Sequence, residues 1–150
     1  MRENYQVLVL PYRYIGGEIQ YALLKREDMG VWQGIAGGGE DFDKTPLASA
    51  KREAKEEMNI DESSEYVVLD SIASIPSFHF KNHQELWGKE TYVIPEYCFG
   101  VNVKENILQL SDEHTEYKWC SYDDANKLLE WDSNRVALWE LNQRLKNEID

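Results

Sequence analysis

The sequence has few features that would cross-link a fold or anchor it in a membrane. Two of its 150 residues are cysteines, Cys98 and Cys120, and each lies in an apolar or aromatic run. We expect both to be buried free thiols in a reducing compartment rather than a disulfide or a metal site. No apolar run approaches the roughly 20 residues of a membrane span, and the first residues carry no signal-peptide pattern. The sequence therefore predicts a cytoplasmic chain without a membrane partner.

Positive charge is also scarce. The chain carries 16 lysine and arginine residues against 28 aspartate and glutamate residues, a formal net charge of -12. Such a surface does not attract a nucleic acid polymer, so that class of partner is not expected. A small polyanionic substrate remains compatible with this charge where bound cations supply positive charge locally.

Linkers, low-complexity tracts and fixed-period repeats are absent as well. With 150 residues and 42% hydrophobic content, the chain is long enough for one core, and we expect a single domain over 1–150. The segments 5–14 and 19–25 are rich in strand-forming residues, and the glycines between them predict a hairpin. A short strand at 31–35 then leads into a glycine-rich loop at 37–39.

A helix is expected directly after this loop. Thr45 is a suitable N-cap, Pro46 suits the first helical position, and Asn59 tolerates the left-handed conformation at the end. The apolar residues at helical spacing are Leu47, Ala50, Ala54 and Met58. Strands are predicted at 66–80, 91–103 and 117–121, and helices at 122–130 and 134–146, the latter capped by Asp132 or Ser133. The outcome is α/β: a curved, mostly antiparallel sheet flanked by helices.

The first helix carries an acidic cluster beside its apolar stripe. At helical spacing Glu53, Glu56 and Glu57 share one arc, and Arg52 lies four residues before Glu56, where the two can pair. Three neighbouring carboxylates repel one another and do not stabilise a helix. With a divalent cation among them, the same cluster becomes a site for handling phosphates.

Together, the glycine run and this helix resemble the signature of the Nudix hydrolase family. The signature is a glycine, five residues, a glutamate, seven residues, and then Arg-Glu-apolar-x-Glu-Glu-x-Gly-apolar. The residues in register are Gly38, Arg52, Glu53, Ala54, Glu56, Glu57 and Ile60. Two positions differ: Lys44 stands where the family has glutamate, and Asn59 where it has glycine. The second change is mild, because asparagine also adopts the left-handed turn.

The missing first glutamate has two interpretations. Counted back from Arg52, its position falls on Lys44; counted forward from Trp32, it falls on Asp43. Asp43 is then a shorter replacement carboxylate after a one-residue insertion. Alternatively the carboxylate is absent, and Lys44 touches a phosphate or points to solvent. Either way, we expect retuned rather than abolished catalysis.

What the resemblance implies is an α/β/α sandwich with a Mg²⁺ or Mn²⁺ site. Glu53, Glu56 and Glu57 would hold metal or act as the base, and a backbone carbonyl at Gly37 or Gly38 would add a ligand. Arg52 would orient a glutamate rather than touch the substrate. Hard oxygen ligands suit these cations, and a bound metal lowers the pKa of an attacking water. Which glutamate is the base stays open, because coupled carboxylates share their titration.

A later segment extends the resemblance. The run 113–125 is similar to the Glu-His…Trp segment of the branch that acts on dATP and dihydroneopterin triphosphate, and the run 131–135 is similar to the same branch. In that branch a late glutamate completes the metal site or acts as base, and Glu113 is the matching position. The alternative for Glu113 is a solvated loop carboxylate.

The candidates for binding the substrate are Arg26, Trp32, Gly38 and Gly39. Arg26 ends the second strand, where relatives present a basic residue to phosphate, although a strand-end charge without a ligand is equally expected. Trp32, at the mouth of the glycine loop, could stack a base or pterin ring, although most aromatic residues in strands belong to the core. The backbone at Gly38 and Gly39 can approach a ligand closely.

The predicted activity is hydrolysis of a (deoxy)nucleoside or dihydroneopterin triphosphate, with release of pyrophosphate. Alternatives are hydrolysis of a dinucleoside polyphosphate or nucleotide sugar, or a non-catalytic module that senses nucleotides. Retention of Glu53, Glu56 and Glu57 argues against the sensor. A monomer and a homodimer are both compatible with the sequence.

Overall fold

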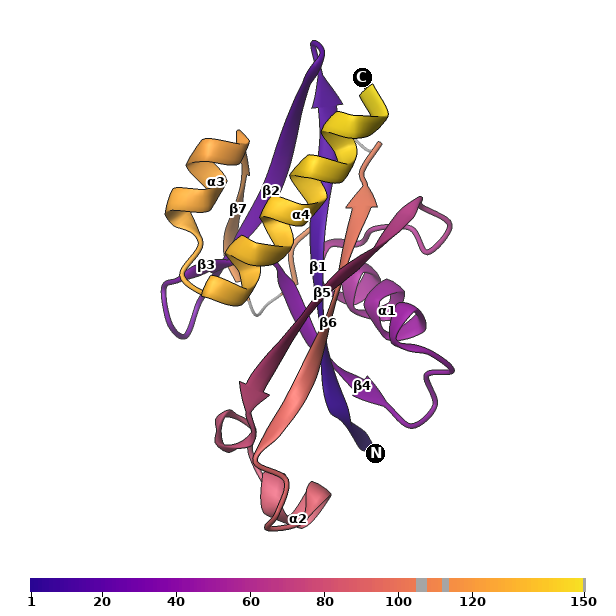
Figure 1. Cartoon of the computed structure of the whole chain (residues 1–150), viewed down its shortest axis with the longest axis vertical. Helices are drawn as coiled ribbons and strands as arrows, with labels where there is room; N and C mark the ends of the chain where they lie inside the picture. Colours follow the sequence, from indigo (N-terminus) through magenta and orange to yellow (C-terminus); the bar gives the residue numbers. More distant parts are fainter. Residues whose placement is uncertain (105–107, 112–113, 150) are drawn as a thin grey trace.

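A mixed, seven-stranded sheet forms the centre of the computed structural model, which describes residues 1–104, 108–111 and 114–149. The strands are β1 (Arg2–Ile15), β2 (Glu18–Arg26), β3 (Trp32–Gln33), β4 (Ile35–Glu40), β5 (Tyr66–Pro76), β6 (Val93–Asn102) and β7 (His114–Cys120). The main path runs β3-β2-β1-β6-β5, with β4 beside β1 and β7 beside β2. β1 and β6 are parallel, and the other paired strands are antiparallel (Figure 1).

Strand β1 is buried on both faces, which makes it the axis of the fold. Its residues alternate between two hydrophobic clusters: Leu8 and Leu10 belong to one, and Val7 and Val9 to the other. This division follows from the strand period of two, which sends successive side chains to opposite faces. An apolar stretch in β1 thus supplies both layers of the core.

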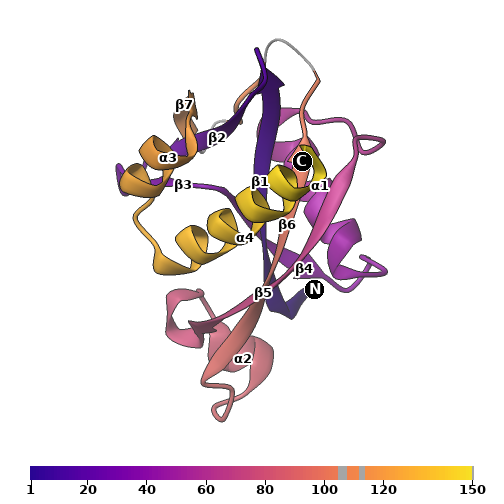
Figure 2. The same cartoon turned by 45° about the horizontal axis from the view of Figure 1, so that its top comes forward.

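The helices cover the two faces of the sheet separately. They are α1 (Pro46–Met58), α2 (His83–Trp87), α3 (Tyr122–Leu128) and α4 (Asp132–Ile149). α1 packs in the cluster of Val7 and Val9, whereas α3 and α4 pack in the cluster of Leu8 and Leu10. α4 crosses the sheet on the side opposite α1, and α2 lies in the connection between β5 and β6 (Figures 1 and 2). The predicted layers of helix, sheet and helix are confirmed.

Two local predictions hold in detail. The hairpin of β1 and β2 turns through Gly16 and Gly17, both at positive φ, as a tight two-residue turn requires. The Thr45 side chain accepts a hydrogen bond from the Ala48 amide and caps α1, while Asn59 ends the helix at φ 57° and ψ 36°. Polar caps and left-handed ends are local properties, so the sequence alone determines them.

Three other predictions need correction. The glycine run 37–39 lies in strand β4, paired with β1, and not in a loop. The predicted strand 66–80 ends at Pro76 and continues into a 3-10 turn, η1 (Ser77–His79). Helix α4 begins at Asp132 rather than 134, and the short helix α2 was not predicted. The hydrogen-bond ladder between β4 and β1 outweighs the low strand preference of glycine, whereas β5 ends at Pro76 because proline has no N–H for a further sheet hydrogen bond.

Cys98 and Cys120 are buried free thiols, as predicted. No helix in the described part of the chain is long and apolar enough to cross a membrane. The single-domain boundary, the cytoplasmic location and the oligomeric state stay predictions.

Candidate active site

The acidic cluster of α1 divides into buried and exposed members. Glu53 and Glu57 are buried on the side of the helix that faces the sheet, whereas the side chain of Glu56 is 56% exposed. All three project from consecutive turns of one helix, whose position is fixed by its apolar stripe against β1 and β4. The helical register thus forces two carboxylates below the surface together.

Glu53 is lodged against the backbone of β4. A Cβ atom at Gly37 would overlap the carboxyl group of Glu53, so that side chain occupies the space that any other residue at 37 would fill. The glycine at this position is required by close approach rather than by an unusual backbone angle. Sequence reasoning identified the glycines but not the side chains that depend on them.

The space beside the next two glycines is also occupied by side chains. A Cβ at Gly38 would overlap the guanidinium group of Arg2, and one at Gly39 would overlap the ring of Tyr5. Arg2 packs against the rings of Phe80 and Trp87, with its guanidinium carbon 5.0 and 5.7 Å from their centroids. Side chains of the protein therefore pack against both faces of β4 at these glycines. The sequence had predicted a loop open to a ligand here.

Arg52 joins the helix to the strand. Its guanidinium donates to the Glu53 carboxylate at 3.0 Å and to the Gly38 carbonyl at 2.8 Å, and it pairs with Glu56 at 3.5 Å. Hydrogen bonding to Asp43 raises the pKa of Arg52 still further above its ordinary value, so the residue is a fixed cation. The predicted Arg52–Glu56 pair is present, and the role of Arg52 in orienting a glutamate stays a prediction.

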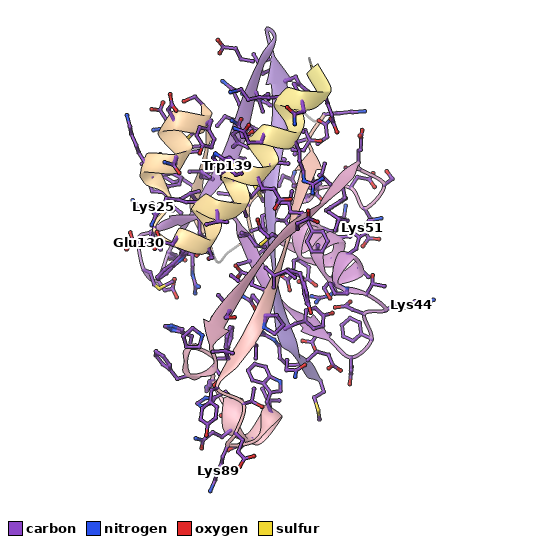
Figure 3. All side chains as sticks on the ribbon, viewed as in Figure 1. Lys25, Lys44, Lys51, Lys89, Glu130 and Trp139 are labelled. Carbon is purple, nitrogen blue, oxygen red and sulfur yellow. The ribbon has the colours of Figure 1, made fainter. Side chains whose placement is uncertain are left out.

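Asp43, and not Lys44, faces the cluster. The Asp43 side chain is 5% exposed and accepts hydrogen bonds from Arg52, the Ser49 hydroxyl and the Glu40 amide. Burial alone would raise the pKa of Asp43, but these hydrogen bonds outweigh it and hold the pKa below its usual range. Lys44 is exposed and extends into solvent at the outer end of the loop before α1 (Figure 3).

Burial raises the pKa of Glu53 to about 7. Arg52 opposes this shift, whereas the neighbouring charges of Glu56 and Glu57 add to it. Despite the nearby Arg52, burial therefore disfavours the charged form of this carboxyl group. It is suited to receive a cation or to hold a proton.

Glu57 contacts the segment that leads to β7. Its carboxylate accepts a hydrogen bond from the Ser111 hydroxyl at 2.8 Å, and its carbonyl accepts one from the Ser111 amide at 2.9 Å. Glu113, the predicted late glutamate, lies outside the described residues. Its predicted role therefore remains a prediction.

The donors of this cluster suit a hard divalent cation. Glu53, Glu56, Glu57 and the Gly38 carbonyl offer only oxygen atoms, which Mg²⁺ and Mn²⁺ prefer. The absence of a side chain at Gly37 lets the Glu53 carboxyl lie against the backbone of β4. Within the described residues, no three acidic, histidine or cysteine side chains are close enough together to hold one metal ion. The set fits a metal in its chemistry, and Glu56 is its most exposed member.

A cavity of about 330 Å³ opens on the other face of the sheet, near the start of α4. Its lining consists of Gln6, Arg26, Met29, Gln33, Ala36, Ile75, Pro76, His79, Phe80, Glu96, Trp131, Ser133 and Asn134. Apolar walls with a few polar groups are typical of sites for small molecules. The cavity and the acidic cluster share strand β4, because Ala36 lines the cavity and Gly37 holds Glu53.

The structure separates the two side chains predicted to bind substrate. Arg26 lines the cavity, where Asp28 accepts its hydrogen bonds at 2.6 and 2.9 Å. Trp32 packs against the α3–α4 cluster and does not line this cavity. Trp131 is the tryptophan at the cavity, and its ring N–H donates to Gln33 at 3.2 Å.

Glu96 is the residue of this cavity that sequence reasoning missed. It lies in β6 and is buried, and burial raises its pKa to about 7. The signal was present as a single carboxylate within the apolar and aromatic run 92–99. A charge at the centre of such a run is unusual in a core strand.

Comparison with known proteins assigns the chain to a protein family. The sequence profile of the NUDIX domain matches residues 6–139, so the chain belongs to the Nudix hydrolase family. Enzymes of this family generally use a divalent metal.

Individual relatives narrow the comparison. A solved structure assigned to the Nudix hydrolases, from Listeria monocytogenes, is 47% identical with a TM-score of 0.86, and the match covers 97% of each chain. The dihydroneopterin triphosphate diphosphatase of Escherichia coli K12 is 29% identical over 119 residues, 77% of each protein. The enzyme of that name from Haemophilus influenzae is 26% identical over 138 residues, 91% of this chain and 86% of the relative.

Proposed function

We propose that this protein is a Mg²⁺- or Mn²⁺-dependent pyrophosphohydrolase of a dihydroneopterin or (deoxy)nucleoside triphosphate. The bond broken is a phosphoric anhydride, and water attacks phosphorus with release of pyrophosphate. The two relatives named dihydroneopterin triphosphate diphosphatase support this class of substrate.

The observation that carries the proposal is the arrangement on β4. Consecutive residues of a strand face opposite sides, so Ala36 borders the cavity while Gly37 receives Glu53 on the α1 side. In the described residues β4 pairs with β1 and lies at an edge of the sheet there. A ligand with its ring in the cavity can therefore extend its phosphates past this edge to the acidic helix.

The position of each residue in the cluster indicates its role. Glu53, Glu57 and Glu56, with the Gly38 carbonyl, would hold the cation, which offsets phosphate charge and lowers the pKa of the attacking water. Arg52 fixes the Glu53 carboxylate and is itself fixed by Asp43. Burial raises the pKa of Glu53 to about 7, so Glu53 is the member of this cluster that most readily holds a proton before the cation binds.

The direct test is release of pyrophosphate and phosphate from a substrate panel, with Mg²⁺ and with Mn²⁺. The panel holds dihydroneopterin triphosphate, the dNTPs, a diadenosine polyphosphate and ADP-ribose. We expect metal-dependent release of pyrophosphate from the triphosphates, and a fall of about 100-fold or more in kcat for Glu57→Gln.

Glu62→Gln is the matched control, because Glu62 is exposed beyond the end of α1. It should retain wild-type rates. Turnover confined to the diadenosine polyphosphate or ADP-ribose would overturn the substrate class. Binding without turnover across the panel, unchanged in Glu57→Gln, would identify a sensor instead of an enzyme.

A further inference from the structure

We propose that Glu96 recognises two adjacent N–H donors on the substrate ring, the edge offered by the 2-amino-4-oxo-pyrimidine ring of guanine and of pterins. This inference deepens the proposed function, and it rests on it for the position of the phosphates. Neither the acidic cluster nor the fold requires a carboxylate at this position.

Glu96 is a buried acid that lacks a partner for one oxygen. Its residue is 5% exposed, and Oε1 has no hydrogen-bond partner among the described residues. The Ser133 side chain hydrogen-bonds the carboxyl group from the first turn of α4. Burying an unsatisfied polar group is costly, so a carboxylate oxygen without a partner that lines a cavity points to a ligand that donates a hydrogen bond to it.

The cavity contains no cation that neutralises Glu96. In the described part of the chain no ion pair involves Glu96, and Arg26, at the cavity wall, is held by Asp28. The amide nitrogen of Asn134 is also engaged, since it donates to the Ser133 hydroxyl at 3.4 Å. Oε1 of Glu96 has no partner among the described residues, although Gln6, Gln33 and His79 also line the cavity, so a ligand in the cavity can supply its donor.

The remaining walls suit a flat ring. Phe80 and Trp131 bring aromatic surface to the cavity, and Ile75 and Pro76 bring aliphatic surface. Such surfaces stack well on a heterocycle and leave its edge to the polar groups. Glu96 is then the group that chooses between rings of similar shape.

An ionised carboxylate matches two neighbouring N–H groups and few other ring edges. Guanine and pterins place an amino group beside a ring N–H, so both oxygens of the carboxylate can accept. Adenine places its amino group beside an acceptor nitrogen, and hypoxanthine lacks the 2-amino group. The chemistry thus favours guanine-like and pterin rings over adenine and hypoxanthine.

The position of Glu96 also suits the distance to the phosphate site. Glu96 pairs with Gln6 across β6 and β1, and Gln6 pairs with Gly38 across β1 and β4. Two strand spacings separate Glu96 from Gly38, roughly 10 Å. A sugar or a short hydroxylated chain can bridge that interval between ring and phosphates.

The test compares dGTP with dITP, which differ by the 2-amino group, in the wild type and in Glu96→Gln. The amide preserves the shape of the side chain but replaces one acceptor with a donor. We expect the wild type to favour dGTP over dITP by about 10-fold or more in kcat/KM. Glu96→Gln should lower kcat/KM for dGTP and dihydroneopterin triphosphate by roughly 10- to 100-fold and leave dITP within about 3-fold.

The control is Glu130→Gln, which makes the same change in charge at an exposed residue outside the cavity (Figure 3). Equal rates for dGTP and dITP in the wild type, or equal losses for both in Glu96→Gln, would overturn the inference. Thermal unfolding of each variant would check that it is folded.

Binding of phosphate-free rings separates this inference from the proposed function. Guanosine and neopterin should bind the wild type more tightly than inosine does, and Glu96→Gln should remove that preference. A protein that shows this preference but hydrolyses no triphosphate retains the inference and loses the proposed function. Hydrolysis of triphosphates without any ring preference retains the proposed function and overturns the inference. A protein that shows neither hydrolysis nor ring preference overturns both proposals.

Discussion

Arg52 binds both carboxylate oxygens of Asp43, with Nε 3.2 Å from Oδ1 and a terminal nitrogen 2.9 Å from Oδ2. This ion pair holds the loop before α1 against the helix. It also settles how the two candidate positions for the first acidic residue of the signature lie: Asp43 faces Arg52, and Lys44 faces solvent.

The first prediction concerns this pair. Asp43→Asn removes the charge that fixes Arg52 and should destabilise the fold by about 1–3 kcal/mol, because Arg52 is left partly buried and underpaired. We expect kcat to fall at least about 10-fold as the Glu53 carboxylate loses its orientation. Urea unfolding and steady-state kinetics measure the two effects. Lys44→Glu should leave both near wild type, and a larger loss in Lys44→Glu than in Asp43→Asn would contradict the assignment.

The second prediction uses the close approach of Gly37 and Glu53. Gly37→Ala places a Cβ where the Glu53 carboxyl lies, so the flexible carboxyl must move. We expect a fall of about 10- to 100-fold in metal-dependent activity with a stability loss near 1 kcal/mol. A double-mutant cycle with Glu53→Gln measures the coupling. If the two changes are independent, Gly37 does not act through Glu53.

Glu96 gives a prediction for pH. Its pKa is raised by burial from 4.5 to about 7 in the folded state, so folding favours its protonated form. The stability associated with protonated Glu96 is complete below pH 4.5 and is lost as the pH rises through 7. Above pH 7, Glu96→Gln should therefore exceed the wild type in unfolding free energy by roughly 2–3 kcal/mol. Urea unfolding in EDTA between pH 4 and 8 checks this, and a constant difference would refute it.

Glu140 predicts the opposite pH dependence. Burial alone would raise the pKa of Glu140, but hydrogen bonds from Ser71, the Asp70 amide and Arg144 lower it to about 2. Their contribution is present above pH 4.5 and is lost as the pH falls toward 2. Glu140→Gln should cost about 1–2 kcal/mol at pH 7, after allowance for solvent screening, and almost nothing near pH 2. Urea unfolding measures this, with the exposed Glu148→Gln as control on the same helix; a loss that persists at pH 2 would contradict the linkage.

The sequence allowed the local features of the site to be predicted because they depend on nearby residues. The cap at Thr45, the end at Asn59 and the arc of Glu53, Glu56 and Glu57 all follow from helical spacing. The layers of the fold were predictable for a similar reason, since the strand-forming run of β1 and the apolar stripe on α1 indicate a buried sheet with a helix packed on it.

Long-range packing was not predictable in this way. The glycines 37–39 read as a loop because glycine weakens a strand, and only the packing of Glu53, Arg2 and Tyr5 shows why they lie in one. The cavity draws on residues from 6 to 134, so Glu96 and Trp131 could not be placed beside each other from the sequence.

The central claim is that the carboxylates of α1 hold the cation that hydrolysis requires. A titration of the wild type with Mn²⁺, followed by electron paramagnetic resonance, with pyrophosphate release measured in the same samples, tests it most directly. We predict that activity rises in proportion to bound Mn²⁺, and that Glu53→Gln and Glu57→Gln each weaken binding by about 10-fold or more. Mn²⁺ affinity that is unchanged in both variants, or pyrophosphate release that persists in EDTA, would contradict the account.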